Sequence, residues 1–268
     1  MDNYIDKLAE YYNEKSTKNI TKLVVITFVI YLSCVIALTY IKVNLFLAVF
    51  IAMLIAIIYA RKKDLVKTLD FFRSIDTILR NSCDVVLYNN TLLEMLKWLD
   101  NKELSNTQTK RILRPLQQRY ILGLITNNQL DKAIEYIEDN KLGQHSNDSC
   151  ISIGLANLEI AQAIDSKDTD LIEEVLAKYT NNKAVNTTSL QASLFMLKGN
   201  NQQAVDYLLD IKSSCMLYNC TKAYLLGTAY MNLEDTNKAI DQFKYVSENG
   251  GSLPIKYESD EVLDSITK

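Results

Sequence analysis

The hydrophobic and polar positions divide the chain into one long apolar block and a series of amphipathic segments. From residue 23 to residue 60 the sequence is almost continuously apolar, and Lys42 is its only charged residue. Beyond residue 60, apolar residues recur three and four positions apart, as in Leu65, Leu69 and Phe72, which is the spacing of one helix face. The chain has only seven Gly and two Pro in 268 residues, and the tight turns of β-proteins need these residues. The pattern predicts an all-α protein.

The apolar block is too long for a single membrane-spanning helix. Its 38 residues would form a helix of about 57 Å, roughly twice the hydrocarbon core of a bilayer. Division near Lys42 leaves segments of 19 and 16 residues, Leu23–Ile41 and Leu45–Ala60. A signal peptide would begin near residue 1, and a buried hairpin of a soluble protein would keep a polar stripe. We therefore predict a transmembrane helical hairpin over residues 20–62.

Basic residues flank this hairpin on both sides, whereas its turn holds only Lys42. The flanking cations are Lys18, Lys22, Arg61, Lys62 and Lys63. The positive-inside rule then predicts a two-pass membrane protein with both termini in the cytoplasm. The spans contain no carboxylate and no mid-depth cation, so the sequence favours an anchor in the lipid bilayer over a transporter.

The segments beside the block have helical patterns of their own. Residues 1–19 place Tyr4 and Leu8 near one face, which predicts a short amphipathic segment at the membrane surface or against a folded domain, with a frayed tail as the alternative. Residues 63–112 are expected to form juxtamembrane helices. In the second of these we expect Asn90 to be the N-cap and Trp98 to be a core anchor.

Charge and cysteine usage exclude several classes of function. Residues 120–268 carry twelve basic and twenty-one acidic residues, a net charge of −9, so a nucleic-acid partner is not expected. Five cysteines form no CxxC pair and His145 is the only histidine, which disfavours zinc sites and histidine-based catalysis. No Gly-rich phosphate loop occurs. We expect free thiols in a reducing compartment, no cofactor, no metal and no enzymatic activity.

Small residues stand at helix contact positions between Lys222 and Phe243. Antiparallel helices approach closely only where their contact points are small, and Gly227 and Ala239 supply such points. Tyr230 and Phe243 would fill the space beside them, and Asp235 would cap the second helix.

This stretch resembles the tetratricopeptide repeat, whose 34-residue pattern contains L-G-x₂-Y and then A-x₃-F. The matching residues are Leu226, Gly227, Tyr230, Ala239 and Phe243, whereas Ala223 replaces the family's Trp. Weaker copies place the small position at residues 133, 172, 204 and 239, spaced 39, 32 and 35 residues apart. The longest gap holds the polar loop of residues 140–149, and residues 254–268 resemble a capping helix. The resemblance covers about residues 113–250 and implies a TPR-like α-solenoid over residues 113–268.

In this family, the first helix of each pair lines a concave groove. The corresponding positions in the two best repeats are Asn186, Ser189, Ser193, Met196, Leu197, Thr221, Tyr224, Thr228, Met231 and Asn232. Hydroxyl, amide, aromatic and methionine surface suits an extended peptide or a partner helix. Some members grip a C-terminal carboxylate with basic groove residues, but the matching positions here carry none. The acidic repeat region therefore predicts a neutral or basic partner segment.

Together these features predict a membrane-anchored TPR-type scaffold or adaptor. It would bind a protein or peptide partner in its concave groove and recruit it to the cytoplasmic membrane surface. Two alternatives stay open, a structural subunit of a larger membrane complex, in contact with other membrane subunits, and a pore-forming membrane effector.

Overall fold

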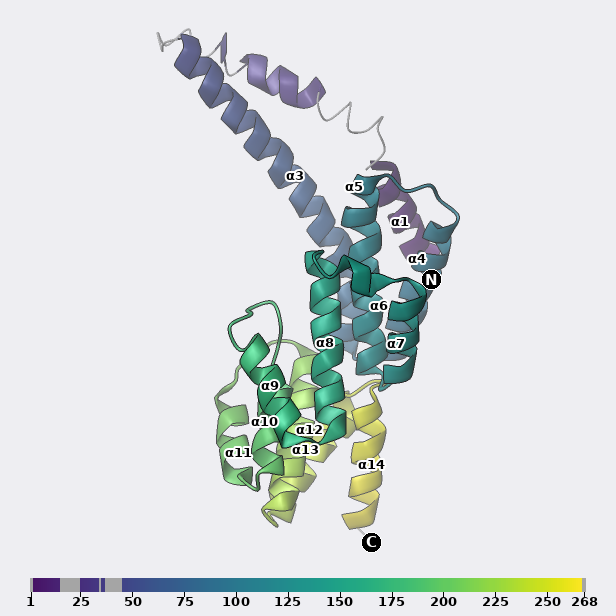
Figure 1. Ribbon diagram of the computed structural model, residues 1–268, viewed down its shortest axis with the longest axis vertical. Coiled ribbons are helices and arrows are strands. Elements are labelled where there is room, and N and C mark those ends of the chain that lie inside the picture. Colours follow the sequence, from purple (N-terminus) through teal and green to yellow (C-terminus); the bar gives the residue numbers. More distant parts are fainter. Residues whose placement is uncertain (1, 15–24, 34, 37–44, 267–268) are drawn as a thin grey trace. The chain divides into compact units, whose positions relative to one another are not determined.

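The chain is helical throughout the part that the structure describes. The computed structural model describes residues 2–14, 25–33, 35–36 and 45–266, and contains helices but no strand in these ranges (Figure 1). The prediction of an all-α protein is therefore confirmed. Contacts divide the chain into two compact units. Unit 1 comprises Met1–Ile75 and Leu104–Gln108, and unit 2 comprises Asp76–Glu103 and Thr109–Lys268.

Unit 1 is built from α1 (Asp2–Glu14), the first part of α3 (Leu45–Ser82) and the short α5 (Asn106–Gln108). Leu8 on α1 is completely buried. The Tyr4 hydroxyl donates a hydrogen bond to the Ser74 carbonyl over 3.4 Å. The predicted amphipathic N-terminal segment is thus a helix that packs on α3.

The described residues do not support the predicted transmembrane hairpin. No helix among them combines the length and the apolar composition that crossing a bilayer requires. Much of the first predicted span, including residues 37–41, lies outside the described residues, as do the flanking Lys18 and Lys22. The two-pass membrane localisation with cytoplasmic termini is therefore wrong on this finding.

The second predicted span has a physical reason for failing. Leu45–Ala60 would be about 24 Å long, shorter than the hydrocarbon core of about 30 Å. It is also not a separate helix, since α3 continues without a break through Arg61, Lys62 and Lys63 to Ser82. Apolar composition located this segment, but it did not reveal that one helix carries both the apolar residues and the charged ones.

Unit 2 continues from the last turns of α3 into α4 (Val85–Asp100), a π-helical segment η1 (Thr109–Leu113) and successive helix pairs. The pairs, with their bounds, are α6 (Arg114–Thr126) and α7 (Leu130–Asp139), α8 (Ser149–Ser166) and α9 (Thr169–Tyr179), α10 (Thr188–Leu197) and α11 (Asn201–Asp210), and α12 (Met216–Asn232) and α13 (Thr236–Asn249). A 3₁₀ segment, η2 (Leu142–His145), occupies the predicted polar loop, and α14 (Pro254–Ile266) is the predicted C-terminal helix.

The turn inside each pair uses one residue with left-handed backbone. These residues are Asn128, Lys167, Gly199 and Glu234, with φ between 54° and 75°. Aspartates then cap the second helices of two pairs, because Asp168 accepts hydrogen bonds from the backbone of Asp170 and Leu171, and Asp235 accepts one from Lys238. The predicted cap at Asp235 is confirmed. The cap predicted at Asn90 is wrong, since α4 begins earlier and Asp84 caps it through the Leu87 amide.

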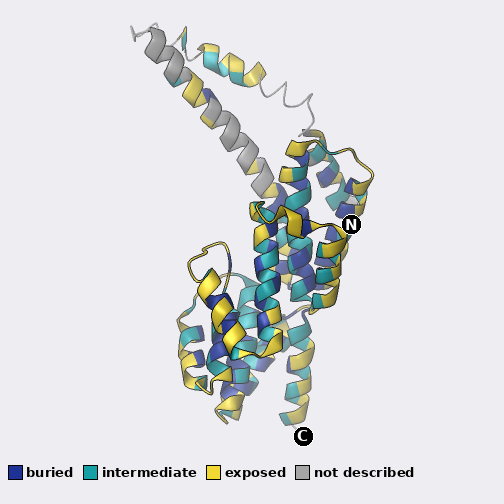
Figure 2. Cartoon of the chain, in the orientation of Figure 1, coloured by how far each residue is buried: buried dark blue, intermediate teal, exposed yellow. Residues whose placement is uncertain are grey.

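The helices of unit 2 carry both buried and exposed positions (Figure 2). The four positions predicted to sit at helix contacts are all completely buried. They are Ala133, Ile172, Ala204 and Ala239. A Cβ added to Gly227 would lie 2.9 Å from the Phe243 ring, so the close approach of α12 and α13 does require a residue without a side chain there. Trp98, in contrast, is only half-buried, and its neighbour Leu99 is the core residue.

Unit 2 closes on itself. Neighbouring first helices pack in the order α4, α6, α8, α10 and α12, and the turn between α3 and α4 then meets α12 and the segment before α14. The Cys83 and Cys220 sulfurs are 4.0 Å apart, and the Ser252 amide donates to the Cys83 carbonyl over 3.1 Å. Gly251 has a φ of +55°, and a Cβ there would lie 2.6 Å from the Ser82 carbonyl oxygen. The first helices therefore surround an interior space.

Candidate ligand-binding cavity

The interior of unit 2 contains a cavity of about 410 Å³, here called the inner cavity. Its walls come from the end of α3, from α4 and α6, and from α10, α11 and α12. The lining residues are Asp76, Leu79, Arg80, Tyr88, Gln118, Arg119, Leu122, Asn186, Thr188, Ser189, Leu208, Cys215, Leu217, Tyr218, Thr221, Lys222 and Leu225. Residues that are far apart in the sequence thus meet at one site.

A second cavity of about 280 Å³, here called the neutral chamber, adjoins the first. Five residues line both: Leu122, Asn186, Ser189, Leu217 and Thr221. The remaining walls come from Ile125, Thr126, Asn157, Ile160, Ala161, Ile164, Leu253 and Ile255. None of these thirteen residues is charged, so the neutral chamber is mainly aliphatic with a few hydroxyl and amide groups.

One wall of the inner cavity is a partly buried polar network. Arg119 donates from Nε and Nη2 to the two oxygens of Asp76, over 2.8 and 2.9 Å. The Tyr88 hydroxyl lies 3.5 Å from the same carboxylate. Burial, and then the nearby Asp76 carboxylate, raise the pKa of the Tyr88 phenol. A bidentate pair of this kind fixes both partners in one geometry, so this wall is rigid and its charges balance.

Two further cations face the cavity. Lys222 donates to the Ile211 carbonyl over 2.7 Å, which leaves two of its three ammonium hydrogens for other acceptors. The Arg80 side chain is exposed, and its carbonyl accepts from the Cys215 thiol over 3.5 Å. No carboxylate in the described part of the chain pairs with Arg80 or with Lys222. The inner cavity therefore has an excess of positive charge.

The structure brings three of the ten predicted groove residues into this site. Asn186, Ser189 and Thr221 line both cavities. Ser189 lies at the N-terminal end of α10, Thr221 lies on α12, and Asn186 lies in the connection just before α10. The sequence therefore located part of the interior wall.

The other seven predicted groove residues lie elsewhere. Tyr224 donates to Glu258 of α14 and stacks edge-on against Phe243. Asn232 bonds Asn201, and Met196 packs against the core cluster of α10–α14. Ser193 and Thr228 are partly buried, whereas Leu197 and Met231 are exposed at the far ends of their helices. These seven do not line either cavity.

Sequence reasoning missed the cations and the Tyr88 wall. Arg80 and Tyr88 precede the predicted repeats, Arg119 lies outside the two repeats from which groove residues were predicted, and Lys222 follows the predicted groove residue Thr221 by one position. No local pattern marks Arg80 and Tyr88, because only the closure of unit 2 brings α3 and α4 against the later helices.

Other chemistry is sparse in the described residues. His145 is exposed in η2. No group of three or more His, Cys, Asp or Glu side chains that could hold a metal ion occurs in the described ranges. Cys83, Cys150, Cys215 and Cys220 are free thiols.

Comparisons of this chain with protein-family models, with curated proteins and with solved structures yield no match. The geometry of the two cavities is therefore the basis for an argument about function.

Proposed function

We propose that unit 2 is a tetratricopeptide-like scaffold without enzymatic activity that holds a segment of a partner protein against its inner surface. The observation that carries this proposal is the convergence of Asn186, Ser189 and Thr221 on one cavity. These positions come from different helix pairs and were selected from the repeat pattern alone. Hydroxyl and amide groups along an inner helical face provide hydrogen bonds for a peptide backbone.

The closure of unit 2 restricts the shape of the segment. The Cys83–Cys220 contact and the Ser252–Cys83 hydrogen bond join the beginning of unit 2 to its end. A long extended peptide would have to pass through this closed ring, whereas a short loop or a chain end can enter a cavity of about 410 Å³. The acidic surface of residues 120–268 would favour neutral or basic regions on the rest of the partner.

Site-specific photocrosslinking tests the proposal with a matched pair of tyrosines. Tyr218 lines the inner cavity, and Tyr257 on α14 is 57% exposed and lines neither cavity. Each is replaced by p-benzoylphenylalanine, the crosslinked peptide is mapped by mass spectrometry, and that peptide is synthesised. We expect a crosslink from position 218 only, and binding of the synthetic peptide that Ser189→Trp abolishes. Capture from position 257 alone, or binding that Ser189→Trp leaves intact, would show that the inner surface is not the partner site.

A further inference from the structure

The inner cavity has the opposite charge from the region that forms most of it. Three basic side chains and one carboxylate line it, whereas residues 120–268 carry a net charge of −9. The bidentate pair of Arg119 with Asp76 is balanced, so Arg80 and Lys222 supply the excess. Like charges that face one cavity repel each other, and a bound anion would relieve that repulsion.

The neutral chamber complements this positive region. It begins at residues shared with the inner cavity and ends at aliphatic side chains that include Ile160, Ile164 and Ile255. Apolar walls of this kind make favourable dispersion contacts with an aliphatic chain. A cationic site and an uncharged apolar site therefore share five lining residues.

Size and closure favour a compact ligand. The two cavities, of about 410 and 280 Å³, lie near the lower limit for small-molecule sites. The contacts that close unit 2 bound the interior on the side of α3 and α4. Such a space suits a small molecule with one charged end and one apolar end.

We infer that the two cavities bind a single-chain amphiphilic anion, with its anionic head between Arg80 and Lys222 and its aliphatic chain in the neutral chamber. The head is a carboxylate or a phosphate monoester, since both accept charge-assisted hydrogen bonds from guanidinium and ammonium groups. The inference goes beyond the proposed function, because this ligand needs no partner protein. A partner segment that enters the inner cavity would compete with it.

Calorimetric titration of the purified full-length chain with dodecanoate tests the inference. We expect one dodecanoate per chain, binding about tenfold weaker for dodecanol, which lacks the charge, and no binding of dodecyltrimethylammonium. Dodecyl phosphate in a parallel titration distinguishes the two head groups. Octanoate should bind more weakly than dodecanoate, because it buries fewer methylenes.

Variants locate the bound amphiphile on the chain. Arg80→Gln should weaken dodecanoate binding about tenfold, and Arg80 is exposed, so its replacement is not expected to disturb folding. Lys222→Met should act in the same direction. Lys244→Met is the matched control, because Lys244 is exposed on α13 and lines neither cavity. Ile164→Trp, which fills the neutral chamber, should reduce dodecanoate binding more than octanoate binding.

The inference is overturned if dodecanol binds as tightly as dodecanoate, or if Arg80→Gln and Lys244→Met have equal effects. It is also overturned if neither Arg80→Gln nor Ile164→Trp changes binding, since the amphiphile would then bind elsewhere on the chain. Crosslinking of a partner from position 218 without any dodecanoate binding would reject the amphiphile and leave the proposed function standing. Binding of dodecanoate without any crosslinked partner would do the reverse.

Discussion

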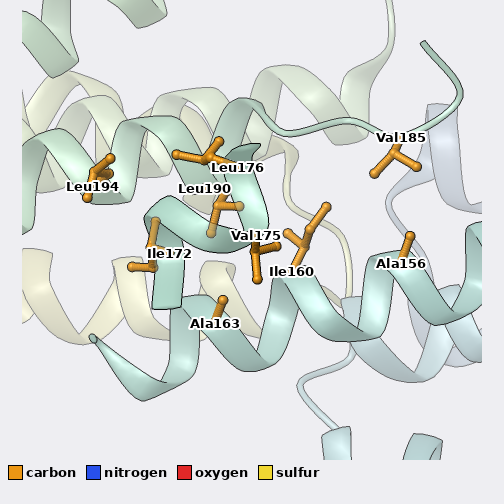
Figure 3. Close-up of a cluster of buried hydrophobic side chains, with 9 residues drawn as sticks. All are labelled: Ala156, Ile160, Ala163, Ile172, Val175, Leu176, Val185, Leu190 and Leu194. Atoms are coloured by element: carbon orange, nitrogen blue, oxygen red, sulfur yellow. The ribbon is translucent and has the colours of Figure 1, made fainter. Parts of the chain in front are cut away.

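The helix pairs α8–α9 and α12–α13 solve the same packing problem with large and small side chains exchanged. At one pair of corresponding positions, α12–α13 has the large Tyr230 on its first helix and the small Ala239 on its second. The pair α8–α9 has Ala163 and Ile172 at these positions (Figure 3). All four residues are buried in their clusters. The interface thus conserves total volume between facing helices, and not the residue type at each position.

A second pair of corresponding positions differs in another way. In α12–α13, Gly227 faces the Phe243 ring, and an added Cβ would be 2.9 Å from it. In α8–α9 these positions hold Ile160 and Leu176, two aliphatic residues in one cluster. In α12–α13 the packing depends on one glycine against one large ring, whereas in α8–α9 two side chains of similar size fill the space between the helices. A sequence pattern that scores each position separately recognises α12–α13 and nearly misses α8–α9.

The largest expected effect comes from placing a small residue on α9 at the position that holds Ala239 in α13. Ile172→Ala places Ala opposite Ala163, so it leaves a cavity and should lower the free energy of unfolding by about 3 kcal/mol. Urea denaturation followed by circular dichroism measures the change. Leu171→Ala on the same helix is the control, because Leu171 is 37% exposed. A loss below about 1 kcal/mol for Ile172→Ala would mean that a small residue fits α9 as well as it fits α13. The exchange of large and small residues between the two helix pairs would then not contribute to stability.

A smaller effect is expected at the glycine of the other pair. Gly227→Ala gains about 1 kcal/mol of helix propensity but forces a methyl group against the Phe243 ring. Overpacking of this kind costs about 1–3 kcal/mol, so we expect a net loss of about 1 kcal/mol. In a Phe243→Leu background the same substitution should be neutral or stabilising. A double-mutant cycle by urea denaturation measures this coupling, and additive effects would contradict the close approach of α12 and α13.

Residues that match a local pattern were predictable, and long-range arrangements were not. Asp235 as a cap, the burial of Ala239 and the position of α14 follow from short stretches of sequence. The place of Arg80 in the inner cavity does not, because α3 comes before the predicted repeats and reaches the interior only through the closure near Gly251. The sequence shows that residue 251 is a glycine, but it does not predict the close contact of Gly251 with the Ser82 carbonyl, because these two residues are far apart in the chain.

The predicted groove residues also divide into those that a local pattern places correctly and those whose surroundings depend on distant parts of the chain. Ser189 and Thr221 lie in the N-terminal portions of α10 and α12, and Asn186 lies just before α10; all three line the cavities. Tyr224 has the same kind of position, but α14 covers it through Glu258. The repeat pattern describes one unit and its neighbours, whereas a terminal helix that folds over the surface is outside its scope. The same limit explains the membrane prediction, in which composition could not show that α3 continues to Ser82.

Of the two helix pairs compared, only α8–α9 has an ion pair between its own two helices among the described residues. This ion pair can be tested by changing the pH. Lys178 Nζ lies 2.7 Å from a Glu159 oxygen, and the Tyr179 hydroxyl donates to the same carboxylate over 2.6 Å. Burial opposes ionisation of Glu159, but these two hydrogen bonds outweigh it and lower its pKa. The resulting stabilisation is present above the unfolded pKa of about 4.3 and is lost as the pH falls through the lower folded value.

We therefore expect Glu159→Gln to lower the free energy of unfolding at pH 7, and the difference from the native chain to shrink in acid. Because the Glu159 side chain is 36% exposed, solvent screening limits the effect to at most about 1 kcal/mol. Urea denaturation at pH 7 and at about pH 3, below the reference glutamate pKa, measures it. Glu248→Gln on α13 is the control. If the free energy of unfolding of Glu159→Gln stays equally far below that of the native chain in acid, lost packing and not the lost charge causes the difference.

The smallest expected effect is a stabilisation, whereas the preceding substitutions destabilise. It distinguishes a glycine against a flexible side chain from a glycine against an aromatic ring. A Cβ on Gly154 of α8 would lie 3.3 Å from the Ile121 Cδ1 methyl and 3.7 Å from the Gln118 Cα. That methyl is the end of a side chain and can move by rotation, whereas the Phe243 ring beside Gly227 also packs edge-on against Tyr224. Gly154→Ala should therefore keep most of its helix-propensity gain and raise the free energy of unfolding by about 0.5 kcal/mol. A parallel denaturation series with Gly227→Ala provides the comparison. If both substitutions destabilise equally, Gly154 lies against α6 as tightly as Gly227 lies against the Phe243 ring, and the difference that the structure shows between the two glycines would have no energetic consequence.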